Sequence, residues 1–132
     1  MQRIQREGYP VPVSGEFIDI LEKEITASNH KGGCLILNFR DPTYSAERGG
    51  FHPIEVMISK GVICYITDFA YVGAPPFEEL AKQIDFDFKH HVFQQMGRDQ
   101  RIAKGVGLYR IWEANFNSYY QMGVYQTEVS SC

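Results

Sequence analysis

The sequence has 132 residues, of which 44% are hydrophobic and 22% are charged, and its formal net charge is −3. These values exclude a disordered or fibrous chain, and the length fits a single domain over residues 1–132. The acidic balance provides no clustered basic face, so we expect no nucleic-acid partner.

The N-terminal segment and the cysteines bear on the compartment. MQRIQREGYPVPVSGEF contains no continuous apolar segment of the kind a secretory signal requires, and no apolar run in the sequence is long enough to span a membrane. We therefore expect a cytoplasmic protein with no membrane partner.

The three cysteines, Cys34, Cys64 and Cys132, are odd in number and widely spaced. The first two lie in apolar strand-like runs, where cysteine usually acts as a small buried hydrophobe, so no structural disulfide is expected.

A helix is predicted over residues 15–28. Ser14 is a suitable N-cap, and Glu16 lies near the positive end of the helix. Apolar side chains recur at helical spacing on one side of the segment, at Phe17, Ile18, Leu21 and Ile25. Asparagine and glycines in residues 28–33 favour the left-handed conformation that ends a helix. The apolar side of this helix has to pack against another element.

Three strand-like runs follow, over residues 34–40, 51–59 and 62–70. They combine alternating apolar residues with β-branched and aromatic side chains. Only Lys60 and Gly61 separate the last two runs, which favours a tight antiparallel hairpin. The run 62–70 is apolar on both sides, so its second side, which carries Tyr65 and Phe69, is expected to be covered by a helix or by another subunit.

The next part of the chain alternates between turn signals and short apolar patterns. Residues 72–76 indicate a linker, and residues 77–82 are expected to form one helical turn. Apolar and acidic residues alternate strictly over 84–88, which predicts a strand with its acidic side chains facing outward. Residues 91–95 are expected to form its hairpin partner.

A long helix is predicted over about residues 99–121, with Asp99 as its N-cap. An aromatic stripe on one side of this helix would cover the sheet. Gly123 ends the helix, and residues 124–129 form a last strand. The predicted class is therefore α+β, with an antiparallel sheet of about five to seven strands flanked by an N-terminal helix and a long C-terminal helix.

No motif in the sequence fixes a chemistry. The histidines and cysteines do not occur at metal-ligand spacing, so neither a metal nor another cofactor is expected. No serine or cysteine lies in a recognisable activating context, so no catalytic residue is assigned. His52, Glu55 and Asp68 would converge into an acid–base set if the second and third strands pair suitably.

The stretch FRDPTYSAERGGFHPIE, residues 39–55, interrupts the apolar strands with a polar connection rich in turn residues. It is longer than the usual hairpin loop, and unusually long ordered loops are often binding loops. A functional loop and a purely structural one both remain open at this point. If the loop binds a partner, we expect Asp41, Tyr44, Arg48 and His52 to make the contact.

Three segments resemble the signature sequences of a bacterial family of short proteins classified as a domain of unknown function: FRDPTYSAERGGFHPIEV, YITDFAYVG and IWEANFNSYYQMGVY. The resemblance runs from about Gly33 to Val129, and the first segment is the most specific. It implies a family whose members occur on mobile genomic islands. It also implies a fold similar to that of the mitochondrial acidic matrix proteins, an antiparallel sheet flanked by terminal helices. The family supplies no catalytic residues.

The matrix proteins are ring-shaped oligomers that bind many protein partners, including a complement component, and have no accepted catalytic activity. A shared fold does not imply a shared function. The present chain also lacks their long acidic loops and strong negative charge. A host-interaction role such as complement binding therefore rests on analogy of fold alone.

Two hypotheses of different classes follow from the sequence. The leading one is a non-catalytic protein-binding or assembly module that self-associates through the sheet side with Tyr65 and Phe69 and contacts an unknown protein through the loop 41–52. The alternative is a small enzyme or small-ligand binder with His52, Glu55 and Asp68 in a cleft. The second hypothesis requires a shifted pKa for His52, and an ordinary histidine pKa would count against it.

Overall fold

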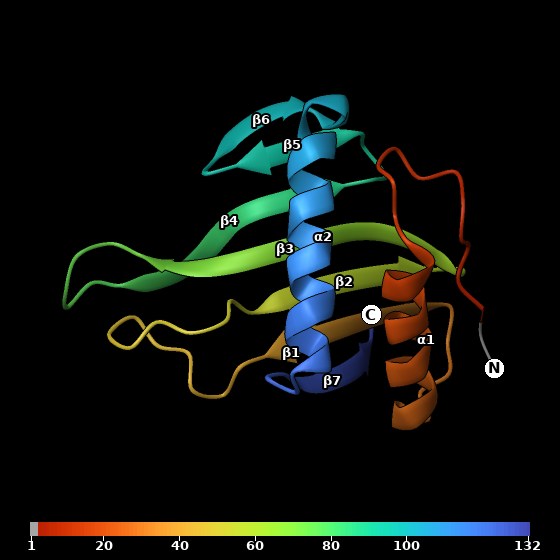
Figure 1. Cartoon of the computed structure of the whole chain (residues 1–132), viewed down its shortest axis with the longest axis horizontal. Coiled ribbons are helices and arrows are strands. Elements are labelled where there is room, and N and C mark those ends of the chain that lie inside the picture. Colours follow the sequence, from red (N-terminus) through yellow and green to blue (C-terminus); the bar gives the residue numbers. More distant parts are fainter. Residues whose placement is uncertain (1–2) are drawn as a thin grey trace.

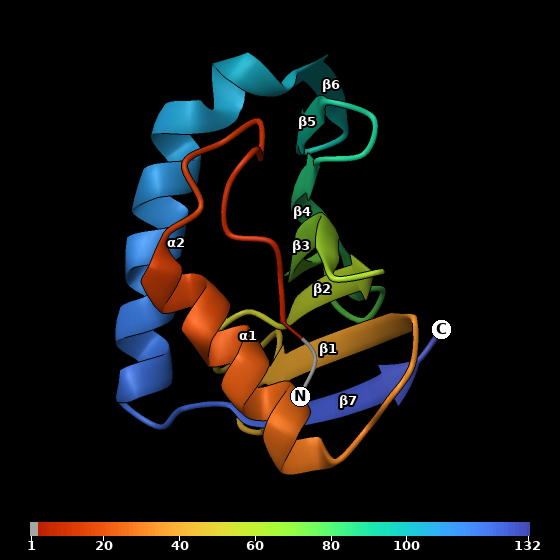
Figure 2. The ribbon, with the colours of Figure 1, turned by 90° about the vertical axis from the view of Figure 1, so that its right-hand side faces the viewer.

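The computed structural model describes residues 3–132, and its sheet is a single layer with the α-helices on one side (Figures 1 and 2). The sheet has seven strands in the order β6-β5-β4-β3-β2-β1-β7. Each neighbouring pair is antiparallel. The predicted α+β class, with an antiparallel sheet flanked by an N-terminal and a long C-terminal helix, is confirmed.

The elements follow one another along the chain with these bounds: α1 (Gly15–Ser28), β1 (Cys34–Arg40), β2 (Ile54–Ser59), β3 (Val62–Val72), β4 (Glu79–Asp87), β5 (Val92–Gln95), β6 (Arg98–Arg101), a 3₁₀ turn (Ile102–Gly105), α2 (Val106–Gln121) and β7 (Gln126–Ser131). Within residues 3–132, no helix combines the length and apolar character needed to cross a membrane.

The predicted bounds of α1 are confirmed at both ends. The Ser14 side chain accepts a hydrogen bond from the Phe17 backbone N–H at 3.1 Å, which satisfies one of the free donors of the first turn. Asn29 ends the helix in the left-handed conformation, with φ of 58°. The apolar side of α1 is buried in the core shared with the sheet.

The core lies between the sheet and the helices. Leu35, Leu37 and Phe39 of β1 project to this side because side chains alternate along a strand, and none is more than 1% exposed. The aromatic stripe of α2 packs over them, with Phe39 and Phe116 in an edge-to-face contact at 5.0 Å between ring centroids. The predicted role of the stripe, covering the sheet, is confirmed.

The opposite side of the sheet carries no helix (Figure 2). Tyr65 lies on this side, and its hydroxyl donates a hydrogen bond to Glu55 at 2.6 Å. Tyr65 and Phe69 are each partly exposed. The expectation that a helix of the chain covers this side is wrong, and cover by another subunit stays a prediction.

Two expectations for the second half of the chain are wrong. Residues 77–82 do not form a helical turn, because β4 begins at Glu79 and pairs with β3 along its length. Asp99 does not cap a helix, because residues 98–101 form the edge strand β6. That strand is exposed along its whole length, so no apolar alternation marked it in the sequence. The helix begins only at Val106.

The expectation of no disulfide is also wrong, because Cys34 and Cys132 are bonded, with 5.3 Å between their Cα atoms. β7 runs antiparallel beside β1, which brings the end of the chain to the first residue of β1. A separation of 98 residues hid this pairing in the sequence. Cys64 is free. Disulfides are rare in the reducing cytoplasm, and the expected cytoplasmic location stays a prediction.

Candidate functional site

A pocket of about 320 Å³ lies between the sheet and α2, beside the end of the loop 41–52. We call it the aromatic pocket. Five of its lining residues are aromatic: Phe51, Trp112, Phe116, Tyr119 and Tyr125. Four others are polar: His52, Asp68, Gln83 and Asn115. The lining therefore combines apolar walls with a few polar groups, as small-molecule sites commonly do.

Asp68 is the most connected polar residue of the aromatic pocket. Its Oδ1 lies 2.7 Å from Nδ1 of His52, and its Oδ2 accepts a hydrogen bond of 3.0 Å from the indole Nε1 of Trp112. Asp68 comes from β3, Trp112 from α2, and His52 from the segment just before β2. The residue is only 8% exposed, and both carboxylate oxygens have partners, as a buried charge requires.

The contact with Asp68 shifts the pKa of His52. The hydrogen bond to Asp68 raises the pKa of the imidazole above 6.5, and the charge of Asp68 and a hydrogen bond with the Gln83 side chain act in the same direction, whereas burial opposes them. The Nδ1–H of the ring donates to the Asp68 carboxylate. The His52 side chain is 34% exposed, so solvent reaches the ring.

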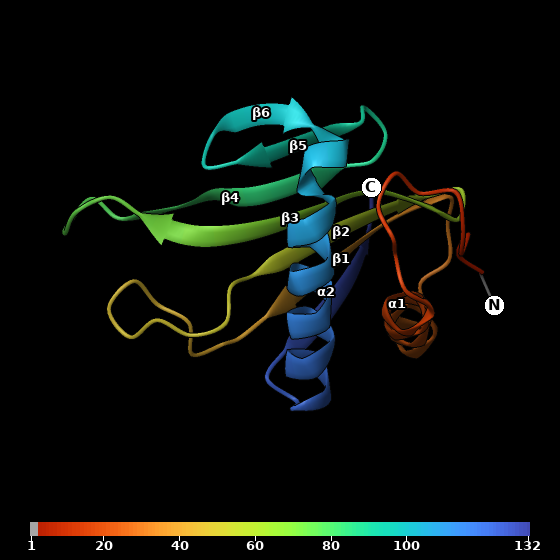
Figure 3. The same ribbon diagram turned by 45° about the horizontal axis from the view of Figure 1, so that its top comes forward.

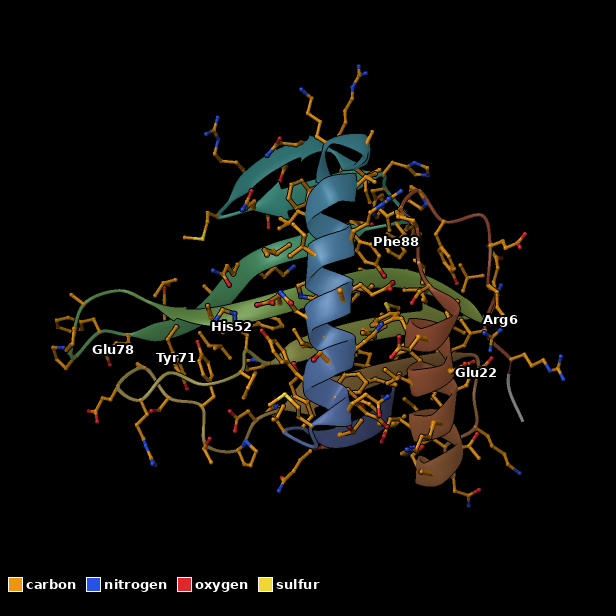
Figure 4. The ribbon with its side chains drawn as sticks, in the orientation of Figure 1. Arg6, Glu22, His52, Tyr71, Glu78 and Phe88 are labelled. Atoms are coloured by element: carbon orange, nitrogen blue, oxygen red, sulfur yellow. A yellow bond between two sulfur atoms is a disulfide. The ribbon has the colours of Figure 1, made fainter. Side chains whose placement is uncertain are left out.

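Tyr44 supports His52 from the side of the loop. Its ring centroid lies 5.4 Å from that of His52 and 5.3 Å from that of Tyr71. Its hydroxyl accepts a hydrogen bond of 3.0 Å from the Tyr71 backbone N–H. The loop and the β3–β4 hairpin project from the same end of the sheet (Figures 1 and 3), and Figure 4 shows His52 between Tyr71 and α2. Tyr44 thus ties the loop to β3.

Asp41 organises the loop from within. Its Oδ1 accepts hydrogen bonds from the backbone N–H and the hydroxyl of Thr43, at 2.9 and 2.7 Å, and its Oδ2 accepts one of 3.0 Å from the Phe51 N–H. The bond from Phe51, followed by those from Thr43, lowers the pKa of Asp41. Arg48 is exposed, and its guanidinium makes no ion pair with residues 3–132.

The structure brings together two of the three residues of the expected acid–base set. His52 and Asp68 are in contact, whereas Glu55 lies on the other side of the sheet and accepts a hydrogen bond from Tyr65. The reason is the alternation along β2: Ile54 lines the aromatic pocket, so the next side chain points away from it. The expectation that Glu55 shares a cleft with the pair is wrong.

Trp112 and Gln83 were not identified from the sequence as site residues. The aromatic stripe of α2 indicated only a helix packed on a sheet, and the distance of 44 positions between Asp68 and Trp112 hides their hydrogen bond. Gln83 lies at a β-bulge between β3 and β4, where the register shifts. In the sequence, the one indication of an aromatic site was the aromatic enrichment of residues 109–125.

The arrangement provides hydrogen bonding in an apolar setting. Among residues 3–132, the pocket lining includes no serine, threonine or cysteine that His52 could activate as a nucleophile. The described part of the chain also has no cluster of three or more histidine, cysteine or carboxylate side chains placed to hold a metal ion.

Comparisons with known proteins agree with this architecture. A family model described as "Protein of unknown function (DUF2787)" matches residues 15–130. The hypothetical protein VC0508 from the Vibrio cholerae VSP-II pathogenicity island is 36% identical, with a TM-score of 0.83, and the match covers 96% of this chain and 100% of that chain. The search of curated proteins found no match.

A second solved structure is that of the conserved hypothetical protein VC1805 from pathogenicity island VPI-2 of Vibrio cholerae O1 biovar eltor. It is 32% identical, with a TM-score of 0.82, and the match covers 94% of this chain and 98% of that chain. That protein is described as sharing structural homology with human P32. The resemblance noted in the sequence is confirmed, and the chain belongs to the DUF2787 family.

Proposed function

We propose that this protein is a non-catalytic binding module whose recognition site is the aromatic pocket together with the adjoining loop 41–52. The observation that carries the proposal is the buried connection from His52 through Asp68 to Trp112 inside an aromatic lining. This connection fixes the imidazole in one orientation at the wall of the pocket.

Binding fits the geometry better than acid–base catalysis. Glu55, the second carboxylate of the alternative hypothesis, faces the other side of the sheet. Both oxygens of Asp68 are already hydrogen-bonded, so this carboxylate has a positioning role. A fixed donor at an aromatic wall is what selective binding requires.

The loop 41–52 acts as the frame of the site in this proposal. Asp41 holds the loop by hydrogen bonds within it, and Tyr44 ties the loop to β3 through the Tyr71 backbone N–H and contacts His52. Glu47 and Arg48 are exposed charged side chains of the loop and are available to a protein partner. A protein that binds here would therefore contact Arg48 and place a side chain in the aromatic pocket.

Thermal unfolding with a panel of four small compounds tests the proposal. The panel contains adenine (a neutral heterocycle), benzoate (an anion), benzyltrimethylammonium (a cation) and indole (apolar). A ligand that binds only the folded state stabilises it by about 2.7 kcal/mol at one hundred times its dissociation constant. We expect at least one compound to raise the melting temperature.

A matched pair of variants on α2 shows whether the effect arises in the pocket. Tyr119 lines the pocket, whereas Ile111 is 62% exposed and does not. Tyr119→Ala should reduce the stabilisation, and Ile111→Ala should leave it unchanged. If no compound stabilises the protein, or if both variants respond as the wild type does, the pocket is not the recognition site.

A second candidate function is self-association through the side of the sheet that lacks helices. Tyr65 and Phe69 of β3 lie only partly buried there, and no helix covers them (Figure 2). Partly buried aromatic side chains on an uncovered face favour an interface between copies. This assembly function is compatible with the pocket, because the pocket lies on the helical side.

A further inference from the structure

We infer that the aromatic pocket takes a neutral, planar nitrogen heterocycle whose edge carries both hydrogen-bond donors and acceptors, such as a purine base. The inference rests on the proposed function and narrows it to one class of ligand. Four features of the pocket carry it: its aromatic wall, its size, its balance of charge, and the hydrogen-bonding groups at its polar side.

The rings of the pocket suit a flat ligand. Trp112 stacks on Phe116 with 5.4 Å between centroids and 15° between planes, and Phe116 stacks on Tyr125 at 5.3 Å and 23°, so these rings form one continuous aromatic wall. Phe51 and Tyr119 contact each other at 4.6 Å with their planes tilted by 59°. Aromatic walls attract planar rings, and stacking of a base on an aromatic side chain contributes about 1–3 kcal/mol.

The size of the pocket limits the ligand further. Its volume of about 320 Å³ is at the lower end of the range for small-molecule sites, which begins at roughly 300 Å³. A one-ring or two-ring heterocycle with a small substituent fits this volume.

The charges of the pocket favour a neutral ligand. Asp68 is the one carboxylate of the lining in residues 3–132, and both of its oxygens are occupied by His52 and Trp112. A cation would therefore find the carboxylate already hydrogen-bonded. No lysine or arginine of residues 3–132 lines the pocket, and the imidazole of His52 lies 2.7 Å from Asp68, so an anion would find no unpaired cation. Either ion would lose hydration without a matching charge.

The polar side of the pocket offers both donors and acceptors. His52 presents its Nε2, Gln83 lies near it, and Asn115 is exposed at the rim. Each side-chain amide carries two N–H donors and one carbonyl acceptor. The edge of a base has the complementary arrangement, and asparagine and glutamine are the usual partners of adenine for this reason. A benzene ring would leave these groups unpaired.

Isothermal titration calorimetry with adenine and adenosine tests the inference, with benzoate, benzyltrimethylammonium and indole as comparison compounds. Adenine should bind more tightly than each comparison compound. Gln83→Leu and Asn115→Leu should weaken adenine binding by about tenfold each, because each removes a hydrogen-bonding amide. Ile111→Ala, on the exposed side of α2, should leave the affinity unchanged.

Binding of adenosine as well as adenine identifies nucleosides as ligands, and binding of adenine alone identifies the free base.

The outcomes separate this inference from the proposed function. Tighter binding of benzoate, benzyltrimethylammonium or indole overturns the ligand class but leaves a binding pocket. Unchanged adenine affinity in both leucine variants also overturns the ligand class, because the amides of Gln83 and Asn115 then do not bind the ligand. If none of the five compounds binds, both the class and the proposed function fail.

Discussion

Asp68 links three parts of the chain that are remote in sequence. It joins the segment before β2 through His52 and joins α2 through Trp112. Removing the carboxylate would leave an indole N–H and an imidazole N–H without partners in a largely buried setting, which is costly. This residue therefore determines both the shape of the pocket and the protonation of His52.

The titration of His52 should reflect its contact with Asp68. In the wild type, NMR should give a pKa above 6.5, and Asp68→Asn should lower it because the main cause of the increase is removed. An unchanged His52 pKa in Asp68→Asn would show that the pair is not formed in solution.

The same contact makes stability depend on pH. The folded-state pKa of His52 is raised above the unfolded value, so its contribution is fully present below 6.5 and is lost as the pH rises through the folded pKa. The difference in the free energy of unfolding between the wild type and His52→Gln should therefore be larger at about pH 5.5 than at about pH 9. Urea unfolding at both pH values measures it, and a difference that grows with pH would contradict this sign.

Gly50 has little room for a side chain. Its φ is +130°, and a Cβ there would lie 2.8 Å from the Asp41 Oδ2 and 3.2 Å from the Tyr44 Cα. Gly49 also has positive φ, at +70°, but nothing lies near its Cβ position. Gly50→Ala should destabilise the fold by about 2–3 kcal/mol and Gly49→Ala by about 1 kcal/mol, measured by urea unfolding. Equal losses would mean that the loop does not pack as described.

Single residues of the site were only partly predictable from the sequence. The pairing of His52 with Asp68 was anticipated, because both lie close to adjacent strands. Glu55 was misplaced, because side chains alternate along a strand and Glu55 therefore faces away from its neighbour Ile54, which lines the pocket. Trp112 was missed because its partner lies in another element.

At the scale of elements, the Cys34–Cys132 bond fastens the edge strand β7 to β1. The denatured, unreduced protein should contain one free thiol, Cys64, and alkylation followed by mass spectrometry counts it. Cys132→Ser should lower the free energy of unfolding by about 2–4 kcal/mol, because the bond closes a long loop. Cys64→Ser is the matched control. Three free thiols before reduction would contradict the pairing.

Elements with a strong apolar pattern were predicted well, and those without one were not. α1, β1 and the β2–β3 hairpin match their expected positions, because caps and alternation agreed with the tertiary structure. β6 and the first half of β4 were missed. Both segments are polar or exposed. They form strands because a neighbouring strand pairs with them, and this pairing leaves no apolar pattern in the sequence.

At the scale of the whole molecule, the uncovered side of the sheet determines whether copies associate. If Tyr65 and Phe69 form an interface, light scattering should show a mass above that of one chain, and aspartate at both positions should reduce it to the monomer. Ile111→Asp on α2, at a residue that is 62% exposed, is the control for a new surface charge. A wild-type monomer, or an oligomer unaffected by the double substitution, would rule out this interface.

The most direct measurement uses the indole signal of Trp112. The chain has one tryptophan, so a nitrogen–proton correlation NMR spectrum contains a single indole resonance, from the group that donates to Asp68 inside the pocket. A saturable shift of this resonance on titration with adenine is the predicted result, and it should be absent in Tyr119→Ala and retained in Ile111→Ala. A resonance that stays in place with adenine, benzoate, benzyltrimethylammonium and indole alike would contradict a binding function for the pocket.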